Sequence, residues 1–234
     1  MIDVHLKYLE HFADLPDAVV VDVGCGEGAL VRALAERKAR PIGIAPAGPR
    51  LEAARALSPR SKRIRYEAGA PDALPLDDGA ADLVTCLFTF GALPAERHAA
   101  ALREARRVLR PGGRLHMVEP FAEGPYFELI RLIDDPTERR AQTIRSVAST
   151  WDMGLKPLIA GSYIHLERFT GFEDFRARIT DGDEVRGETF ALHERALRDT
   201  FVRLGLGDGS GAVIFRQPCR LYHFSRVDMA EQAA

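Results

Sequence analysis

Residues 19–30 read Val-Val-Val-Asp-Val-Gly-Cys-Gly-Glu-Gly-Ala-Leu, and this stretch decides the fold. The β-branched run predicts a strand, the three glycines predict a tight turn, and an amphipathic pattern then begins a helix. A strand that passes through glycines into a helix brings a ligand close to bare backbone. We therefore expect Gly24, Gly26 and Gly28 to contact a nucleotide-like cofactor.

Strand and helix patterns alternate on both sides of this loop as far as Glu119. Strands are expected over residues 18–23, 40–44, 64–68, 82–88 and 114–119, and helices over 3–15, 27–38, 50–57 and 94–109. The strand at 82–88 is almost continuously apolar, as expected when helices cover both faces of a sheet. This rhythm predicts an α/β fold with a doubly wound, mostly parallel sheet of the Rossmann-like kind.

The rhythm changes after Glu119. We expect a helical insert over residues 125–134 and 136–151, an irregular stretch that contains His165, a strand over 172–179 and a helix over 188–204. Residues 212–215 and 220–224 predict an antiparallel C-terminal hairpin around Gln217-Pro218. The length is compatible with a single domain over 1–234, with a cofactor-binding half at 1–119 and a lid and acceptor-site half at 120–234.

Composition narrows the class of protein. The 234 residues carry a formal net charge of -2, and no basic patch interleaved with aromatics predicts a nucleic-acid partner. The 3 cysteines lie far apart in the sequence, which favours a reducing compartment over a disulfide framework or a zinc site. Neither a signal peptide nor a membrane-spanning run is recognisable. We expect a cytoplasmic protein with a small-molecule substrate.

The residue that precedes the glycines distinguishes between cofactors. Asp22 lies two residues before Gly24, at the carboxyl end of the predicted strand. Pyrophosphate would be repelled by a carboxylate there, whereas a ligand that carries an amine or a sulfonium would be attracted. Asp22 therefore favours a positively charged ligand over a dinucleotide.

Two further segments, before the fourth strand and before the fifth, add to the evidence from the glycine loop. Leu74-Pro75-Leu76 precedes Ala81-Asp82-Leu83-Val84, and Arg110-Pro111-Gly112-Gly113 joins a helix to the fifth strand. In this order and spacing, residues 18–119 resemble the class I S-adenosylmethionine-dependent methyltransferases. The resemblance implies that S-adenosyl-L-methionine is the cofactor, that the loop with Cys25 lies against its methionine part, and that Asp22 helps to organise that end.

Two positions depart from the family's pattern. The family usually ends its second strand with an acid that accepts both ribose hydroxyls, and this chain has Ala45 there. The family often carries an aspartate that bonds the adenine amino group, and this chain has Ala70, followed by Pro71 and Asp72. Loss of the ribose carboxylate weakens binding by about 10–100-fold unless water, Asp72 or Glu27 replaces it.

Residues for the chemistry are sought beyond the carboxyl ends of the strands, where open α/β sheets bind ligands. Phe88 at the fourth strand is a candidate for cofactor contact. Glu119 at the fifth could orient a substrate or accept a proton, although such a glutamate equally often caps a helix. His165 is the best candidate for a general base. We expect His116 to be packed within its strand and His98 to lie on a solvated helix face.

Three functions stay open on these residues. The first is a methyltransferase that acts on a small, apolar or aromatic molecule. The second is a degenerate member of the family without methyl transfer, which serves as a partner subunit or in another role; a homodimer or a heteromeric partner fits either. The third is an NADP-dependent oxidoreductase, which would need Arg50 to contact a 2′-phosphate.

Overall fold

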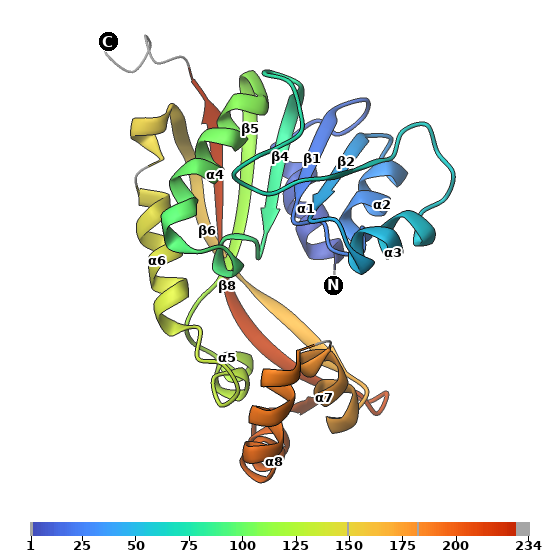
Figure 1. Cartoon of the computed structure of the whole chain (residues 1–234), viewed down its shortest axis with the longest axis vertical. Coiled ribbons are helices and arrows are strands. Elements are labelled where there is room, and N and C mark those ends of the chain that lie inside the picture. Colours follow the sequence, from blue (N-terminus) through green and yellow to red (C-terminus); the bar gives the residue numbers. More distant parts are fainter. Residues whose placement is uncertain (1, 149, 182, 228–234) are drawn as a thin grey trace. The chain divides into compact units, whose positions relative to one another are not determined.

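The computed structural model describes residues 2–148, 150–181 and 183–227 and divides the chain into two compact units (Figure 1). The sheet unit comprises Ile2–Glu119, Gln142–Gly161 and the described residues from Arg220 onward. The small unit comprises Pro120–Ala141 and Ser162–Cys219. The chain passes between the units several times, so each is built from segments that are distant in the sequence.

The sheet has 8 strands, in the order β3-β2-β1-β4-β5-β8-β6, and β7 pairs with β8. Its parallel part follows the predicted alternation of strands and helices. It consists of β1 (Val19–Val23), β2 (Arg40–Ala45), β3 (Arg65–Ala68), β4 (Ala81–Leu87) and β5 (Leu109–Pro120). The order reverses between β1 and β4, and such a reversal is where open α/β sheets bind their ligands.

Helices cover both faces of this parallel part. On one face, α1 (Ile2–Phe12) and α2 (Ala29–Glu36) pack Leu6, Leu9, Leu30 and Leu34 against Val20 and Leu83. On the other, α4 (Ala95–Val108) packs Leu102 and Ala105 against a cluster that contains Val21, Val84 and Leu115. α3 (Pro49–Leu57) contributes Leu51 to a smaller cluster with Cys25, Val31 and Ala45. The doubly wound architecture is thereby confirmed.

The C-terminal strands are antiparallel, as expected, but the turn is elsewhere. β8 (Val213–Arg226) is continuous through Gln217-Pro218, and its antiparallel neighbour is the short β7 (Leu206–Gly207). Antiparallel partners exchange two amide hydrogen bonds, and Pro218 has no N–H to donate. Phe121 N donates to Pro218 O (2.9 Å), and the Gln217 side-chain amide donates to Phe121 O (3.0 Å) in place of the missing N–H. The strand therefore tolerates proline.

Two predictions for the small unit and its surroundings were wrong. Residues 172–179 form helix α7 (Phe172–Thr180) rather than a strand. Phe172, Phe175 and Ile179 repeat at the spacing of a helix, and this spacing, rather than the alternation of a strand, is the correct interpretation of the segment. The stretch around His165 is not irregular but belongs to β6 (Leu155–Phe169), an edge strand with mostly exposed side chains and hence no alternating pattern.

The small unit has an aromatic core of its own. α5 (Pro125–Ile130), α7 and α8 (Glu184–Leu204) bury phenylalanine rings that contact one another, such as Phe169 and Phe175 with centroids 5.4 Å apart. The other buried phenylalanine rings among the described residues of this unit are Phe127, Phe172, Phe190, Phe201 and Phe215. The expected helical insert after the fifth strand is confirmed by α5 and by α6 (Thr137–Ala148).

Candidate cofactor and active site

The glycine loop leaves β1 at its carboxyl end and lies against β2. Gly24, Gly26 and Gly28 all have positive φ values, of 81°, 52° and 76°, which side chains rarely adopt. Gly24 N and Cys25 N both donate to Ile44 O, at 2.8 Å and 3.0 Å. A Cβ on Gly24 would lie 2.8 Å from Thr89 Oγ1, because that hydroxyl is held on Val23 O. The loop is thus fixed with its backbone close to the topological switch point.

Asp22 is the buried acid behind this loop. Its side chain is 3% exposed, and its Oδ1 accepts a hydrogen bond from Thr85 Oγ1 at 2.9 Å. Burial raises the pKa of the Asp22 carboxyl to about 7, and the Thr85 hydroxyl opposes that rise. A cation bound beside Asp22 would stabilise its ionised form and recover part of the cost of burial. The geometry fits the positively charged ligand that the sequence predicts.

Cys25 has the small buried side chain that the turn accommodates. Its thiol is 8% exposed, and burial together with the nearby Asp22 charge raises its pKa to about 12. A thiol with that pKa is not ionised at neutral pH and is a poor nucleophile. Cys25 therefore remains a candidate for cofactor contact through its backbone rather than for covalent chemistry.

The residues expected at the nucleoside end carry no free carboxylate. Ala45 ends β2 with its methyl group buried. Ala70 and Ala73 each donate a backbone hydrogen bond to the other's carbonyl oxygen. Pro71 and Asp72 continue this loop after β3. Arg97 binds both oxygens of Asp72, with Nε 2.5 Å from Oδ2, and holds the pKa of that carboxyl below its usual range. Asp72 is therefore already paired.

Phe88 stands directly after β4 in a strained backbone conformation. Its φ of 58° is uncommon for a bulky residue, and its side chain is 36% exposed. Its amide donates to Val118 O at 2.8 Å, and its ring meets the edge of His5 with centroids 5.6 Å apart. Strain of this kind persists where a surrounding structure imposes it, often at ligand sites. This supports Phe88 as a candidate contact at the same edge as Asp22.

Glu119 holds the segment after β4 in place. The carboxylate is 5% exposed and accepts the amides of Phe90 (2.7 Å) and Gly91 (3.2 Å), which begin the short helix η1 (Phe90–Ala92). His98 fixes the same segment because its Nε2 lies 2.9 Å from Phe90 O and 3.0 Å from Leu93 O. The expectation that His98 is solvated was wrong, since it is 2% exposed.

Glu119→Ala is expected to lower the free energy of unfolding by about 2–4 kcal/mol, because two amides lose a charged acceptor in a buried place. Urea unfolding followed by circular dichroism measures the change. The exposed Glu188 on α8 offers a matched control, and Glu188→Ala should change stability by less than about 0.5 kcal/mol. Equal effects of the two substitutions would show that Glu119 does not hold η1.

His165 lies in the small unit, on β6, whereas Glu119 lies in the sheet unit. Its side chain is 3% exposed, and its Nε2 lies 3.3 Å from Glu167 Oε1. The structure thus places the two catalytic candidates in different units.

Buried histidines form a row that sequence reasoning did not detect. His116 on β5 is opposite Thr85 on β4, and Thr85 is opposite Asp22 on β1, so these side chains share one face of the sheet. His223 on β8 lies next, with its ring centroid 6.0 Å from that of His116. Burial lowers the pKa of His116 to about 3 and that of His223 to about 4. Both are neutral at pH 7. His116 is packed, as expected.

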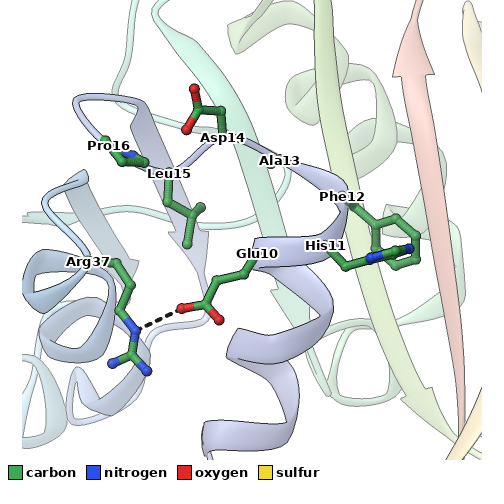
Figure 2. A pocket seen from close by; sticks show the side chains of 8 residues that line it. All are labelled: Glu10, His11, Phe12, Ala13, Asp14, Leu15, Pro16 and Arg37. Atoms are coloured by element: carbon green, nitrogen blue, oxygen red, sulfur yellow. Dashed lines mark hydrogen bonds and ion pairs between the residues drawn. The ribbon is translucent and has the colours of Figure 1, made fainter.

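A ligand could also be held elsewhere among the described residues, by a metal cluster or in another hollow. No group of His, Cys, Asp or Glu in this part of the chain is arranged to hold a metal ion. None of the described helices has the length and apolarity that crossing a membrane requires. A hollow of about 590 Å³ lies at the end of α1, where Arg37 pairs with Glu10 at 2.9 Å (Figure 2). It precedes β1 and lies at the amino edge of the sheet, so we do not assign it to the cofactor.

The two ends of the site differ in their fit to S-adenosylmethionine. The methionine end fits, because Asp22 supplies a buried carboxyl group and the loop is open at Gly26, where a Cβ would meet nothing within 4 Å. The ribose end fits less well, because Ala45 offers no acceptor and Asp72 is engaged by Arg97. Asp22, the glycine loop and Phe88 would therefore hold the group mainly by its charged end.

Comparisons with known proteins agree with this fold. A family model described as "Methyltransferase domain" matches residues 21–117, which is less than half of the chain. The ubiquinone biosynthesis O-methyltransferase of Idiomarina loihiensis is 36% identical over 115 residues, which are 48% of this chain and 46% of that protein. The chain thus matches less than half of the length of such curated relatives.

Solved structures extend the likeness over nearly the whole chain. A putative methyltransferase from Bacillus halodurans superimposes with a TM-score of 0.67 at 20% identity and covers 96% of this chain and 100% of its own. The [4+2]-cyclase SpnF superimposes with a TM-score of 0.62 at 18% identity over 97% of this chain and 82% of its own. At these identities the likeness concerns the fold. The expected resemblance to the class I S-adenosylmethionine-dependent methyltransferases is confirmed.

Proposed function

We propose that this chain, which has the class I methyltransferase fold and resembles that family over residues 18–119, transfers a methyl group from S-adenosylmethionine to a small, apolar or aromatic molecule. The observation that carries the proposal is the buried Asp22 beneath a glycine loop whose backbone is fixed against β2. When bound, the cofactor supplies an electrophilic methyl group. Catalysis of such an in-line displacement is mainly positioning.

The roles of the candidate residues follow from their contacts. Asp22, the backbone from Gly24 to Gly28 and Phe88 bind the methionine end. Glu119 acts as a positioning residue, since its carboxylate already holds the two amides of η1. His165, whose Nε2 lies 3.3 Å from Glu167 Oε1, accepts a proton where the acceptor must lose one. Residues 120–234 supply the acceptor side.

A small hydroxylated acceptor is supported by the curated relative that bears the name ubiquinone biosynthesis O-methyltransferase. A cytoplasmic location is supported by Cys25, Cys86 and Cys219, which are buried and unbridged. The formal net charge of -2 supports a function without nucleic acid.

The alternative is a family member without methyl transfer, which acts as a partner subunit or in another role. Ala45 and Ala70 favour it, because they remove the usual acids of the nucleoside end. A protein of the same fold, SpnF, bears the name of a cyclase, so this fold also serves other reactions.

Isothermal titration with S-adenosylhomocysteine tests the proposal. We expect weak binding, with a dissociation constant of about 10–100 μM, since the methionine end is retained while Ala45 and Ala70 replace the usual acids of the nucleoside end. Cofactor binding should also raise the melting temperature, and the rise should grow with the logarithm of the ligand concentration once that exceeds the dissociation constant. Absence of binding at millimolar ligand would refute the proposal, and saturable NADPH binding instead would favour the oxidoreductase that involves Arg50.

A further inference from the structure

Ala45 stands where the glycine loop meets the end of β2. The preceding residue, Ile44, accepts the amides of Gly24 and Cys25 with its carbonyl oxygen. The Ala45 side chain is 6% exposed and packs in the cluster of Cys25, Val31 and Leu51. In nucleoside-binding α/β sheets an acid at this place takes the ribose hydroxyls. A methyl group can neither accept nor donate a hydrogen bond.

Asp72 is the first acid in the loop that follows β3, and its carboxylate is bound by Arg97. Arg97 on α4 reaches Asp72 with Nε 2.5 Å from Oδ2, while its second nitrogen contacts Oδ1. In a bidentate pair of this kind the guanidinium occupies both carboxylate oxygens, which are the atoms that would accept hydrogen bonds from a diol. The Asp72 side chain is 17% exposed and the Arg97 side chain is 44% exposed, so the pair lies at the surface with its carboxylate partly covered.

The loop that carries Asp72 is itself tied to α4. Arg107 donates to Leu74 O at 3.0 Å and to Leu76 O at 2.7 Å. Glu104 accepts Leu74 N at 2.8 Å and pairs with Arg107 at 2.7 Å. Turning the Asp72 side chain toward a ribose would break its pair with Arg97. The loop therefore keeps Asp72 directed to α4.

We infer that this chain recognises its cofactor without reading the ribose hydroxyls, and that Ala45 is the residue that sets this relaxed specificity. The inference rests on the proposed function, because it concerns the same cofactor. Cofactors altered at the 2′ or 3′ position bind as well as the natural one. A carboxylate at this place would discriminate by about 10–100-fold, the size of a charged hydrogen bond.

The test compares S-adenosylhomocysteine with its 2′-deoxy analogue by isothermal titration on the full chain. The wild type should bind both with dissociation constants within about threefold of each other. Ala45→Asp should prefer the ribose compound by about 10–100-fold, and the matched neutral variant Ala45→Asn should stay below about tenfold.

The outcomes separate the two claims. A wild type that already prefers the ribose compound by about tenfold or more overturns the inference and leaves the proposed function standing. A wild type that binds neither compound overturns the proposed function and the inference with it. Ala45→Asp places a charge at a buried position, so this variant is first checked for folding by circular dichroism; the wild-type comparison decides the inference even if the variant does not fold.

Discussion

Asp22→Asn is expected to lose measurable binding of S-adenosylhomocysteine and, at the same time, to make the ligand-free protein more stable at pH 8. The carboxylate is buried, and its pKa of about 7 means that its charge is unfavourable in the ligand-free fold. A neutral amide removes that cost and can still accept from Thr85 Oγ1. We expect a gain of roughly 2–4 kcal/mol at pH 8, measured by urea unfolding.

The same pKa predicts the pH dependence of the wild type. Between pH 4 and about 7 the folded chain binds more protons at Asp22 than the unfolded chain, so this group's contribution to stability falls as the pH rises. Binding of a cationic ligand needs the ionised form, so ligand affinity should rise as the pH increases from about 6 to about 8. The Asp22→Asn protein should lack this pH dependence of stability.

Asp82→Asn is the matched control. Asp82 is also an acid on a parallel strand, but it pairs with Arg110 and accepts Val19 N, so its charge is compensated. Its replacement should lower stability and leave ligand affinity unchanged. Retention of wild-type ligand affinity in the Asp22→Asn protein would contradict the assignment of the methionine end.

Gly28→Ala is expected to destabilise the fold by roughly 2–4 kcal/mol. Gly28 precedes α2 with a φ of 76°, and a Cβ there would lie 2.1 Å from the Tyr66 hydroxyl. That hydroxyl is held by Ser58 Oγ at 2.7 Å, so it cannot move freely. The cost combines a left-handed backbone with overpacking. Thermal unfolding should show a melting temperature lowered by roughly 5–15 °C.

Gly26→Ala isolates the backbone component. Gly26 has a φ of 52°, but a Cβ there would meet nothing within 4 Å. We expect a loss of about 1–2 kcal/mol, smaller than for Gly28→Ala. Equal losses in the two variants would mean that Tyr66 does not support the turn.

Glu119 illustrates how far residue type predicts a role. Its position at the end of a parallel strand was readable from the sequence, because strand ends of such sheets share one edge. Its partners were not readable, since Phe90 and Gly91 are distant in the sequence and meet it only when β4 and β5 pair. Whether a strand-end acid holds a backbone segment or faces solvent is decided by that pairing.

The loop from Asp22 to Gly28 and the alternation around it determined the parallel sheet, because β-branched runs, glycines and helical spacing are local preferences. The same local evidence failed in two places. Residues 172–179 are too short a segment for the apolar spacing to distinguish a helix from a strand. β6 is an edge strand with mostly exposed side chains, and its backbone pairing leaves no pattern in the sequence. Only the tertiary structure showed that Asp72 is bound by Arg97 and that His116 continues the row from Asp22 through Thr85. These contacts join segments that are distant in the sequence. Local preferences cannot predict them, because the residues meet only after the sheet has folded.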